Sequence, residues 1–252
     1  MKATLYRNID LVRIPIKQGV KEYYFPQNVD WAKCKVDKIA VCVPQTACVD
    51  PMDGTTPVLD VNTYTDIYFN IVSSEQQEIF HAVSAEQLAH TNNHPIMIDS
   101  VLDLSQCSLY FTSAPVSDYT LLLYVYHDNK TIETEFMPDR SVTFEFPLDA
   151  GEEINFQEII QTYIHALPAK VKGIAFWSAI SAPAYFTLRD YKLECVLQNL
   201  HSELARPDMN GGSAVDTQIA PMLFDSIDID FQYSHIRNAT SVAGTQTVTI
   251  LY

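Results

Sequence analysis

The sequence has 252 residues, 47% of them apolar and 11% aromatic, which excludes an intrinsically disordered chain and suffices for the cores of two domains. Its formal net charge is −15, and both halves are acidic, with 8 basic against 14 acidic residues in 1–126 and 8 against 17 in the remainder. Because no run of Lys and Arg could displace the counterions of a phosphate backbone, we expect no direct nucleic-acid binding.

Alternating apolar and polar residues in the first part of the chain predict short strands. Residues 5–25 hold two such runs separated by Gly19, and residues 34–43 begin as an alternating run and end as a continuously apolar one. The second pattern is typical of a strand that passes from a half-exposed edge into a core. Residues 44–62 are rich in Pro and Asp and predict a long connection without regular structure.

Residues 66–88 fit two structures. A helix would begin at the capping-box pattern Ser74-Glu75-Gln76-Gln77, whereas a hairpin would turn at the same polar residues between two strands. The related segment 186–197 also alternates with polar residues in its middle, although leucines of 193–204 fall on one helical face as well. We prefer the hairpin for both segments.

The remaining segments predict strands, one helix and one loop. Residues 155–167 place Phe, Ile and Tyr at helical spacing and end before Pro168, which predicts a helix. Residues 207–220 contain Asn210-Gly211-Gly212-Ser213 and predict a mobile loop. The predicted strands are 95–104, 108–112, 119–126, 170–177 and 184–188.

The last 28 residues, Asp225–Tyr252, repeat an earlier segment 126 positions before them. Other matches keep the same order at offsets of 132, 135, 117 and 116 positions, so the copies differ by insertions in loops. We interpret the chain as two tandem domains, 1–127 and 128–252, the second a diverged repeat of the first, with no flexible linker between them. The matched residues are Pro15 and Gly19 with Pro147 and Gly151, Lys35, Val36, Ile39 and Ala40 with Lys170, Val171, Ile174 and Ala175, Tyr68-Phe69 with Tyr185-Phe186, Leu88-Ala89 with Leu204-Ala205, Asp99-Ser100-Val101 with Asp225-Ser226-Ile227, and Val116 and Tyr126 with Val242 and Tyr252.

The five cysteines are an odd number without Cys-x-x-Cys spacing, so we do not expect a disulfide scaffold. Cys34, Cys42 and Cys107 lie in strand-like runs, where cysteine packs as a small apolar residue. This usage indicates folding in a reducing compartment. The first residues lack a continuous apolar segment, so no signal peptide is expected, and no run of about 18 apolar residues predicts a membrane-spanning helix.

Two groups of residues have some likeness to metal ligands. His90 and His94 have the i, i+4 spacing of zinc ligands on a helix, but the residues around them are typical of a turn and no Glu accompanies them. Asp50, Asp53 and Asp60 lie around Gly54, yet the EF-hand spacing is absent and Asp beside Pro and Gly is ordinary turn chemistry. We therefore expect no metal site and no cofactor.

Motifs of catalysis are absent from the sequence. It contains no Gly-x-Ser-x-Gly, no P-loop, no Gly-x-Gly-x-x-Gly and no cysteine in a protease context. Tyrosines such as Tyr23, Tyr24 and Tyr124 lie in alternating runs that favour packing, although exposed tyrosines can also form a carbohydrate platform. We predict no catalytic residue and expect that the protein is not an enzyme.

The hairpin-then-strand series 66–88 with 98–126, and its repetition in 185–204 with 224–252, resembles the tandem or double jelly-roll capsid proteins of bacterial viruses. It resembles the auxiliary capsid proteins of tailed phages less sharply. The resemblance implies a mainly β chain of two tandem jelly-roll-like β-sandwich domains with a few short helices. In the double jelly-roll family the two rolls stand side by side, and three chains form a pseudo-hexagonal capsomer.

The resemblance also implies a function, namely a structural virion protein of the capsid shell or an auxiliary capsid component. Such a protein would self-associate into a trimer or a higher assembly, contact other virion proteins and be located in the virion after assembly in the host cytoplasm. A second interpretation is a non-catalytic carbohydrate-binding or adhesin-type β-sandwich module that holds its ligand with loops 44–62 and 207–220. A third is a cupin-like enzyme, whose clustered His and Glu ligands only His90 and His94 approach.

Overall fold

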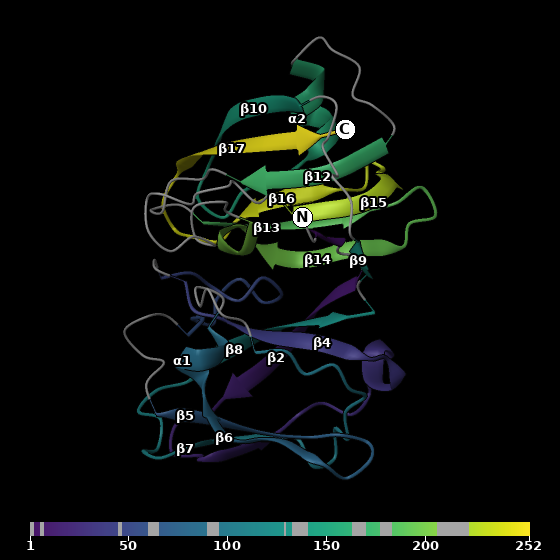
Figure 1. The fold of residues 1–252 in the computed structure, drawn as a ribbon. Coiled ribbons are helices and arrows are strands. Elements are labelled where there is room, and N and C mark those ends of the chain that lie inside the picture. Colours follow the sequence, from purple (N-terminus) through teal and green to yellow (C-terminus); the bar gives the residue numbers. More distant parts are fainter. Residues whose placement is uncertain are drawn as a thin grey trace, which may run out of the picture. The chain divides into compact units, whose positions relative to one another are not determined.

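The structure, a computed structural model, describes residues 3–5, 8–44, 47–59, 66–89, 96–128, 130–132, 141–162, 170–176, 183–205 and 222–252. In this part of the chain the backbone is mainly β with a few short helices, which confirms the predicted fold class. Figure 1 shows two compact units. The N-terminal unit is Asp10–Asp128, and the C-terminal unit is Asn129–Tyr252 together with Met1–Ile9, which the sequence analysis had placed in the first domain.

The described part of the C-terminal unit has eight strands in succession after residue 140. They are β10 (Ser141–Leu148), β11 (Glu153–Asn155), β12 (Lys170–Phe176), β13 (Ala184–Arg189), β14 (Cys195–His201), β15 (Met222–Asp228), β16 (His235–Asn238) and β17 (Gly244–Leu251). They lie in the orders β10-β17-β12-β15 and β11-β16-β13-β14, and the first order is extended by β1 (Ala3–Leu5) and β9 (Lys130–Ile132). Numbered one to eight, the strands follow the orders 1-8-3-6 and 2-7-4-5, which is the connectivity of a jelly roll.

The N-terminal unit has the same strand order. Its strands are β2 (Asn8–Ile16, from Asp10 onward), β3 (Glu22–Tyr24), β4 (Val36–Cys42), β5 (Ile67–Val72), β6 (Glu78–Ser84), β7 (Ser108–Phe111) and β8 (Tyr119–His127). They lie in the orders β2-β8-β4 and β3-β7-β5-β6. If the segment 98–100 is counted as the sixth strand beside β4, these orders are again 1-8-3-6 and 2-7-4-5.

The segment 98–100 pairs with β4 without forming a regular strand. The N–H of Val36 donates to the carbonyl of Ser100 over 2.9 Å, and the N–H of Ser100 donates back over 3.2 Å. We predicted a continuous strand over 95–104, and this is wrong, because the described part of that range forms only isolated bridges. Asp99 has a φ of 54°, in the left-handed region, so its backbone interrupts the extended conformation.

A hydrophobic core lies between the two sheets of the N-terminal unit. β5 shows how alternation builds it, since Ile67, Phe69 and Ile71 are buried and the residues between them are half-buried. β8 is buried at every position, and its alternate residues Leu121, Leu123 and Val125 belong to this core. Each fully buried Phe or Ile side chain stabilises the fold by about 1.5–3 kcal/mol. The core draws on both sheets, with Val12, Ile14, Ile16, Ile39, Val41, Leu121, Leu123 and Val125 facing Ile67, Phe69, Ile71, Phe80, Leu109 and Phe111.

Both predicted hairpins are confirmed. β5 pairs with β6 and β13 pairs with β14, each antiparallel. The turns share a backbone feature, because Gln76 and Leu193 have φ values of 62° and 63°. A short helical turn follows each hairpin, α1 (Ala85–Leu88) in the N-terminal unit and η2 (Ser202–Ala205) in the C-terminal unit.

The predicted helix 155–167 is present where the structure describes it, as α2 (Phe156–Thr162). The Asn155 side chain caps it, because its Oδ1 accepts the N–H of Glu158 over 2.9 Å. The predicted loop 207–220 lies outside the described residues, as does the end of the predicted helix.

The C-terminal strand lies inside a sheet. β17 pairs with β10 on one side and with β12 on the other. Its side chains alternate, with Gln246, Val248 and Ile250 buried. The last residues of the chain are therefore part of the C-terminal unit's packed structure.

Candidate functional site

A cluster of chemically reactive side chains lies at the end of β8 in the N-terminal unit. His127 is the last residue of this strand, Asp128 follows it, and Cys34 ends the 3-10 helix η1 (Asp30–Lys33). β4 pairs antiparallel with β8 so that Val36 lies opposite His127, which brings Cys34 to the same end of the sheet. The donor atoms of Cys34, His127 and Asp128 all lie within 4.8 Å of one another.

The His127 ring is oriented by a carboxylate on its far side. Its Nε2 lies 2.7 Å from Oδ2 of Asp10, a residue of β2. His127 is buried, and its Nδ1 has no hydrogen-bond partner among the described residues. The nearest acidic atom to Nδ1 is Oδ2 of Asp128 at 3.6 Å, which is too long for a hydrogen bond.

The backbone of Lys35 helps to hold Asp128 in place. Its Oδ1 accepts the N–H of Lys35 over 3.2 Å, and its own N–H donates to the carbonyl of Lys35 over 3.0 Å. The backbone φ of Asp128 is 49°, in a left-handed region that Asp tolerates better than most residues. One carboxylate oxygen is thus occupied, and the other faces His127.

Electrostatics within the cluster oppose one role that its composition suggests, a nucleophilic cysteine. Burial, with the Asp128 carboxylate beside it, raises the pKa of the Cys34 thiol to about 11. An activated cysteine needs a lowered pKa, because the thiolate is the nucleophile. Burial alone would lower the pKa of His127, but the Asp10 and Asp128 carboxylates raise it overall. The cluster therefore attracts positive charge and does not generate a thiolate.

We did not predict this cluster from the sequence. Cys34 and His127 are 93 positions apart, and no motif joins them. We assigned Cys34 to a strand, and this is wrong, because β4 begins only at Val36 and Cys34 is half-buried at the end of η1. The signal that could have drawn attention to it is the neighbouring pair His127-Asp128 at the predicted junction.

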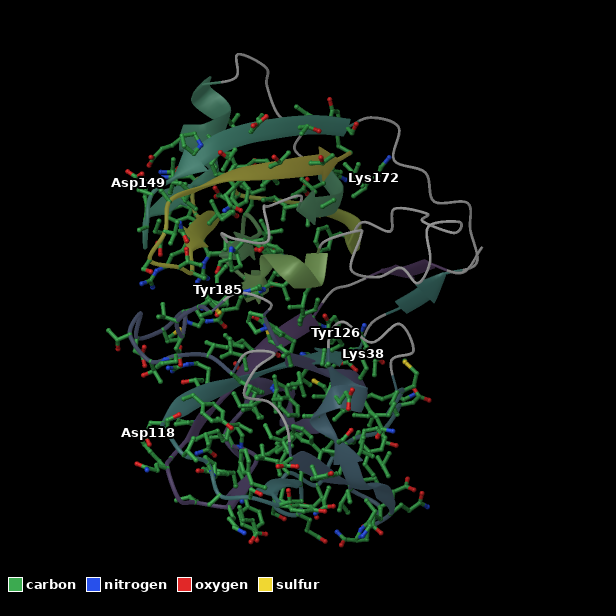
Figure 2. The ribbon with its side chains drawn as sticks, turned by 90° about the vertical axis from the view of Figure 1, so that its left-hand side faces the viewer. Lys38, Asp118, Tyr126, Asp149, Lys172 and Tyr185 are labelled. Atoms are coloured by element: carbon green, nitrogen blue, oxygen red, sulfur yellow. The ribbon has the colours of Figure 1, made fainter. Side chains whose placement is uncertain are left out.

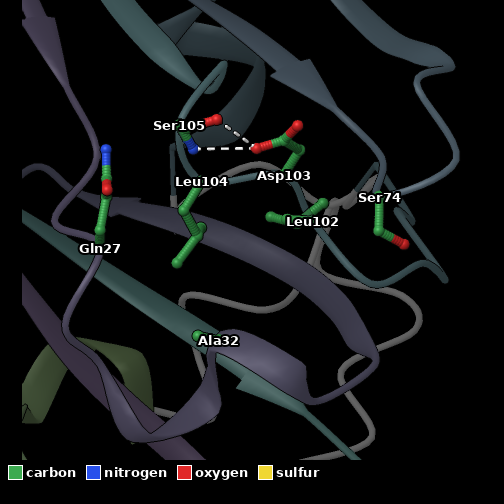
Figure 3. Close-up of a pocket in the computed structure, with 7 residues that line it drawn as sticks. All are labelled: Gln27, Ala32, Ser74, Leu102, Asp103, Leu104 and Ser105. Carbon is green, nitrogen blue, oxygen red and sulfur yellow. Dashed lines mark hydrogen bonds between the residues drawn. The ribbon is translucent and has the colours of Figure 1, made fainter.

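A shallow pocket of about 330 Å³ lies elsewhere in the N-terminal unit (Figure 3). Its one titratable lining residue is Asp103, whose carboxylate is occupied by groups of its own turn and by the Gln76 side chain. Asp103 accepts the backbone N–H of Ser105 over 3.1 Å and the Ser105 hydroxyl over 2.6 Å. These bonds help to keep the pKa of Asp103 below its usual value. The other residues lining the pocket are Gln27, Ala32, Ser74, Leu102 and Leu104.

The described acidic residues of loop 44–62, Asp50 and Asp53, have structural roles. Asp50 is fully buried, and its Oδ2 accepts from Nε and Nη2 of Arg13 over 2.9 and 2.5 Å. Asp53 accepts the backbone N–H groups of Thr55 and Thr56, each over 2.8 Å, which is the turn chemistry expected from the sequence. Asp60, His90 and His94 lie outside the described residues.

The tyrosines considered as a carbohydrate platform differ in exposure. Tyr124 is fully buried, Tyr23 is half-buried and Tyr24 is 58% exposed. Tyr126 packs against a cation, since the Nζ of Lys38 lies 4.2 Å from its ring centroid, and Figure 2 labels both residues. Most of the predicted strand tyrosines that are described thus serve packing.

Exposed apolar side chains gather on two adjacent turns of the C-terminal unit. Tyr191 and Leu193 lie in the turn between β13 and β14, and Tyr233 lies in the turn after β15; their exposures are 62%, 48% and 50%. The turns are joined through the backbone, because the N–H of Asp230 donates to the carbonyl of Arg189 over 2.8 Å. We call Tyr191, Leu193 and Tyr233 the turn patch. Exposed apolar groups of this kind mark interaction surfaces when they lie together.

Comparisons with known proteins give only distant similarities. No protein-family model and no curated protein matches the chain. The major capsid protein P2 from Bacteriophage PM2 is similar at 9% identity and a TM-score of 0.25, over 99% of this chain and 96% of that one. A structure of Sulfolobus Turreted Icosahedral Virus is similar at 11% identity and a TM-score of 0.22, over 100% and 89%. The STIV MCP matches at 11% identity and a TM-score of 0.22, over 96% of both chains.

These TM-scores are too low to carry an argument about function, which is therefore argued from the chain's own geometry.

Among the residues that the structure describes, no helix has the length and apolar character needed to cross a membrane.

Proposed function

We propose that this chain is a structural virion protein, of the capsid shell or an auxiliary capsid component, that acts through contacts between copies and is not an enzyme. The observation that carries this proposal is the strand order. Each unit follows the orders 1-8-3-6 and 2-7-4-5, with residues 98–100 as the sixth strand of the N-terminal unit. Jelly rolls occur in viral capsid proteins, and two of them in one chain supply two sets of similar edges and loops.

We further propose that the domains 1–127 and 128–252 arose by duplication. Residues matched in the sequence occupy equivalent places: Gly19 and Gly151 both follow the first strand of a roll, with φ values of 81° and 69°. A left-handed residue also recurs in the fifth strand, at Ala82 and Asn199, with φ values of 53° and 47°. Shared irregularities of this kind support common descent better than shared apolar residues do, since any strand can match by alternation.

Exposed apolar loop residues support contacts between copies. Val116 and Val242, matched at 126 positions, lie before the last strand of each roll and are 86% and 59% exposed. With the turn patch they leave apolar surface on both units, which a second copy of the chain would cover. We propose assembly into a trimer or larger, contacts with other virion proteins, and location in the virion after assembly in the host cytoplasm.

Light scattering after size exclusion tests self-association over a concentration series. We expect the wild-type mass to reach that of a trimer or more. The variant Tyr191→Ser/Tyr233→Ser should already dissociate at a protein concentration at which wild type remains associated. Met97→Ser is the matched control, since Met97 is 59% exposed and outside the turn patch. A strict monomer at high concentration contradicts the proposal, whereas a wild-type oligomer unaffected by the tyrosine variant would exclude only the turn patch.

One observation favours a second function, a carbohydrate-binding or adhesin-type module. Tyr191 and Tyr233 expose their rings on adjacent turns, and such rings can stack on sugars. This function predicts a monomer that binds glycans and loses binding in Tyr191→Ser/Tyr233→Ser. A glycan array on wild type and this variant separates the two proposals.

A further inference from the structure

We propose that Cys34, His127 and Asp128 form a zinc site with a fourth coordination position open to water. From the sequence we expected no metal ion, but the fold joins residues that no motif connects. It stands apart from the proposed function, since a zinc ion could stabilise the N-terminal unit whether or not copies assemble.

His127 offers the site a free ring nitrogen. Its side chain is 9% exposed, yet Nδ1 has no hydrogen-bond partner among the described residues. A buried polar atom normally finds a partner, because leaving it unsatisfied costs about 1–3 kcal/mol. When Nε2–H donates to Asp10, the lone pair of Nδ1 is directed toward the other side of the ring, where Asp128 lies. A metal ion would supply the missing partner.

Neighbouring groups orient each of the three proposed ligands. Metal-binding histidines usually donate their other ring N–H to a carboxylate or carbonyl, which fixes the tautomer, and Asp10 does this for His127. The N–H of Lys35 holds Oδ1 of Asp128, which leaves Oδ2 as the ligand oxygen. The N–H of Cys34 donates to the carbonyl of Trp31 over 2.9 Å, so the backbone of the third ligand is fixed as well.

The distances between the donor atoms of the three proposed ligands are compatible with zinc. Zinc binds N and O at about 2.0–2.2 Å and S at about 2.3 Å in a tetrahedron, so its ligand atoms lie about 3.3–3.6 Å apart. Nδ1 of His127 and Oδ2 of Asp128 are 3.6 Å apart, and every donor pair of the cluster lies within 4.8 Å. Cys34 is half-buried and Asp128 exposed, so small side-chain rotations can bring the sulfur in.

The types of the three ligands favour zinc over other ions. A thiolate, an imidazole and a carboxylate form a mixed S, N and O set that suits zinc, whereas calcium and magnesium prefer oxygen ligands throughout. Two aspartates and a cysteine around one histidine also give the cluster an excess of negative charge once the thiol is deprotonated. Zinc binding would neutralise this charge and release the thiol proton to water.

The position of the site suggests its role. The N-terminal unit begins at Asp10 and ends at Asp128, so the cluster ties together the two places where the chain enters and leaves that unit. A ligand that binds only the folded state stabilises it in proportion to the logarithm of its concentration over Kd. Zinc would therefore raise the unfolding temperature of the N-terminal unit without any catalytic role.

The experiment uses the full chain, stripped with a chelator and then loaded with zinc or cobalt. We expect one equivalent of zinc after gel filtration, a higher unfolding temperature, and a thiolate-to-cobalt charge-transfer band in the cobalt form. Cys34→Ser should abolish the band and the tight equivalent. Cys195→Ser is the matched control, because Cys195 is an exposed thiol of the other unit and its loss should change neither. Asp10→Asn should weaken zinc binding about 10–100-fold.

Two results would overturn the proposal. One is a wild-type chain that retains no zinc, in which case His127 serves only as the cation between Asp10 and Asp128. The other is zinc retention, or a cobalt band, that persists in Cys34→Ser. Because Cys34 is half-buried and serine is nearly isosteric, this variant should fold, and circular dichroism on each sample confirms that it has.

Discussion

The ion pair between Arg13 and Asp50 should contribute measurably to the stability of the N-terminal unit. The Asp50 side chain is 0% exposed, and Arg13 on β2 donates to its Oδ2 from both Nε and Nη2. Removing one partner of a fully buried pair costs about 3–5 kcal/mol, because the remaining charge is buried alone. The Arg13 side chain is 34% exposed, so solvent screening reduces this, and we expect Arg13→Met to cost about 2–3 kcal/mol.

Urea unfolding, followed by tryptophan fluorescence in a Trp177→Phe background, measures this cost, since buried Trp31 is then the one tryptophan left. Lys17→Met is the control, because its pair with Asp118 is solvent-exposed on both sides and its loss should leave the midpoint unchanged. The double variant Arg13→Met/Asp50→Leu should recover most of the loss. An Arg13→Met midpoint equal to that of Lys17→Met would refute the reasoning.

Three further predictions concern the C-terminus, the thiols and alkaline pH. Deleting residues 247–252 removes most of β17 from between β10 and β12, so the C-terminal unit should unfold; a soluble truncation with unchanged melting would exclude the strand assignment. A thiol reagent at pH 8 should modify exposed Cys195 quickly and buried Cys107 slowly, because burial raises the pKa of Cys107 to about 11; equal rates would contradict this. Burial lowers the pKa of Lys38 to about 8, below its unfolded value of about 10.4, so the unfolded state binds more protons between these pH values. The Lys38 contribution to stability should therefore rise from pH 8 to 10, and Lys38→Met should unfold with a smaller pH-dependent gain than wild type; identical profiles would count against the shift.

The β architecture could be predicted because local patterns determine it. Alternation in residues 67–72 identifies β5, and the polar turn after it identifies the hairpin. The offset that matches Gly19 with Gly151 pairs two turns with the same left-handed backbone, since both follow the first strand of a roll. Such features depend on residues near one another in sequence.

Other features depend on contacts that alternation does not encode. The sequence pattern of residues 95–104 predicts a strand, yet the left-handed Asp99 and the turn at Asp103 reduce the described part to isolated bridges. The sequence pattern predicts Cys34 as the first residue of a strand, but Cys34 ends η1. Only the register of β4 against β8 brings it close to His127. The free Nδ1 of His127 could not be foreseen either, because it depends on Asp10 from a third strand.

The central claim, that copies of this chain assemble into a virion, is tested most directly by electron microscopy of a producing lysate with gold-labelled antibody against the chain. The account predicts particles that carry the label repeatedly on their surface or, after disruption, on shell fragments. A lysate in which the chain is abundant but no particle or fragment carries the label would contradict it.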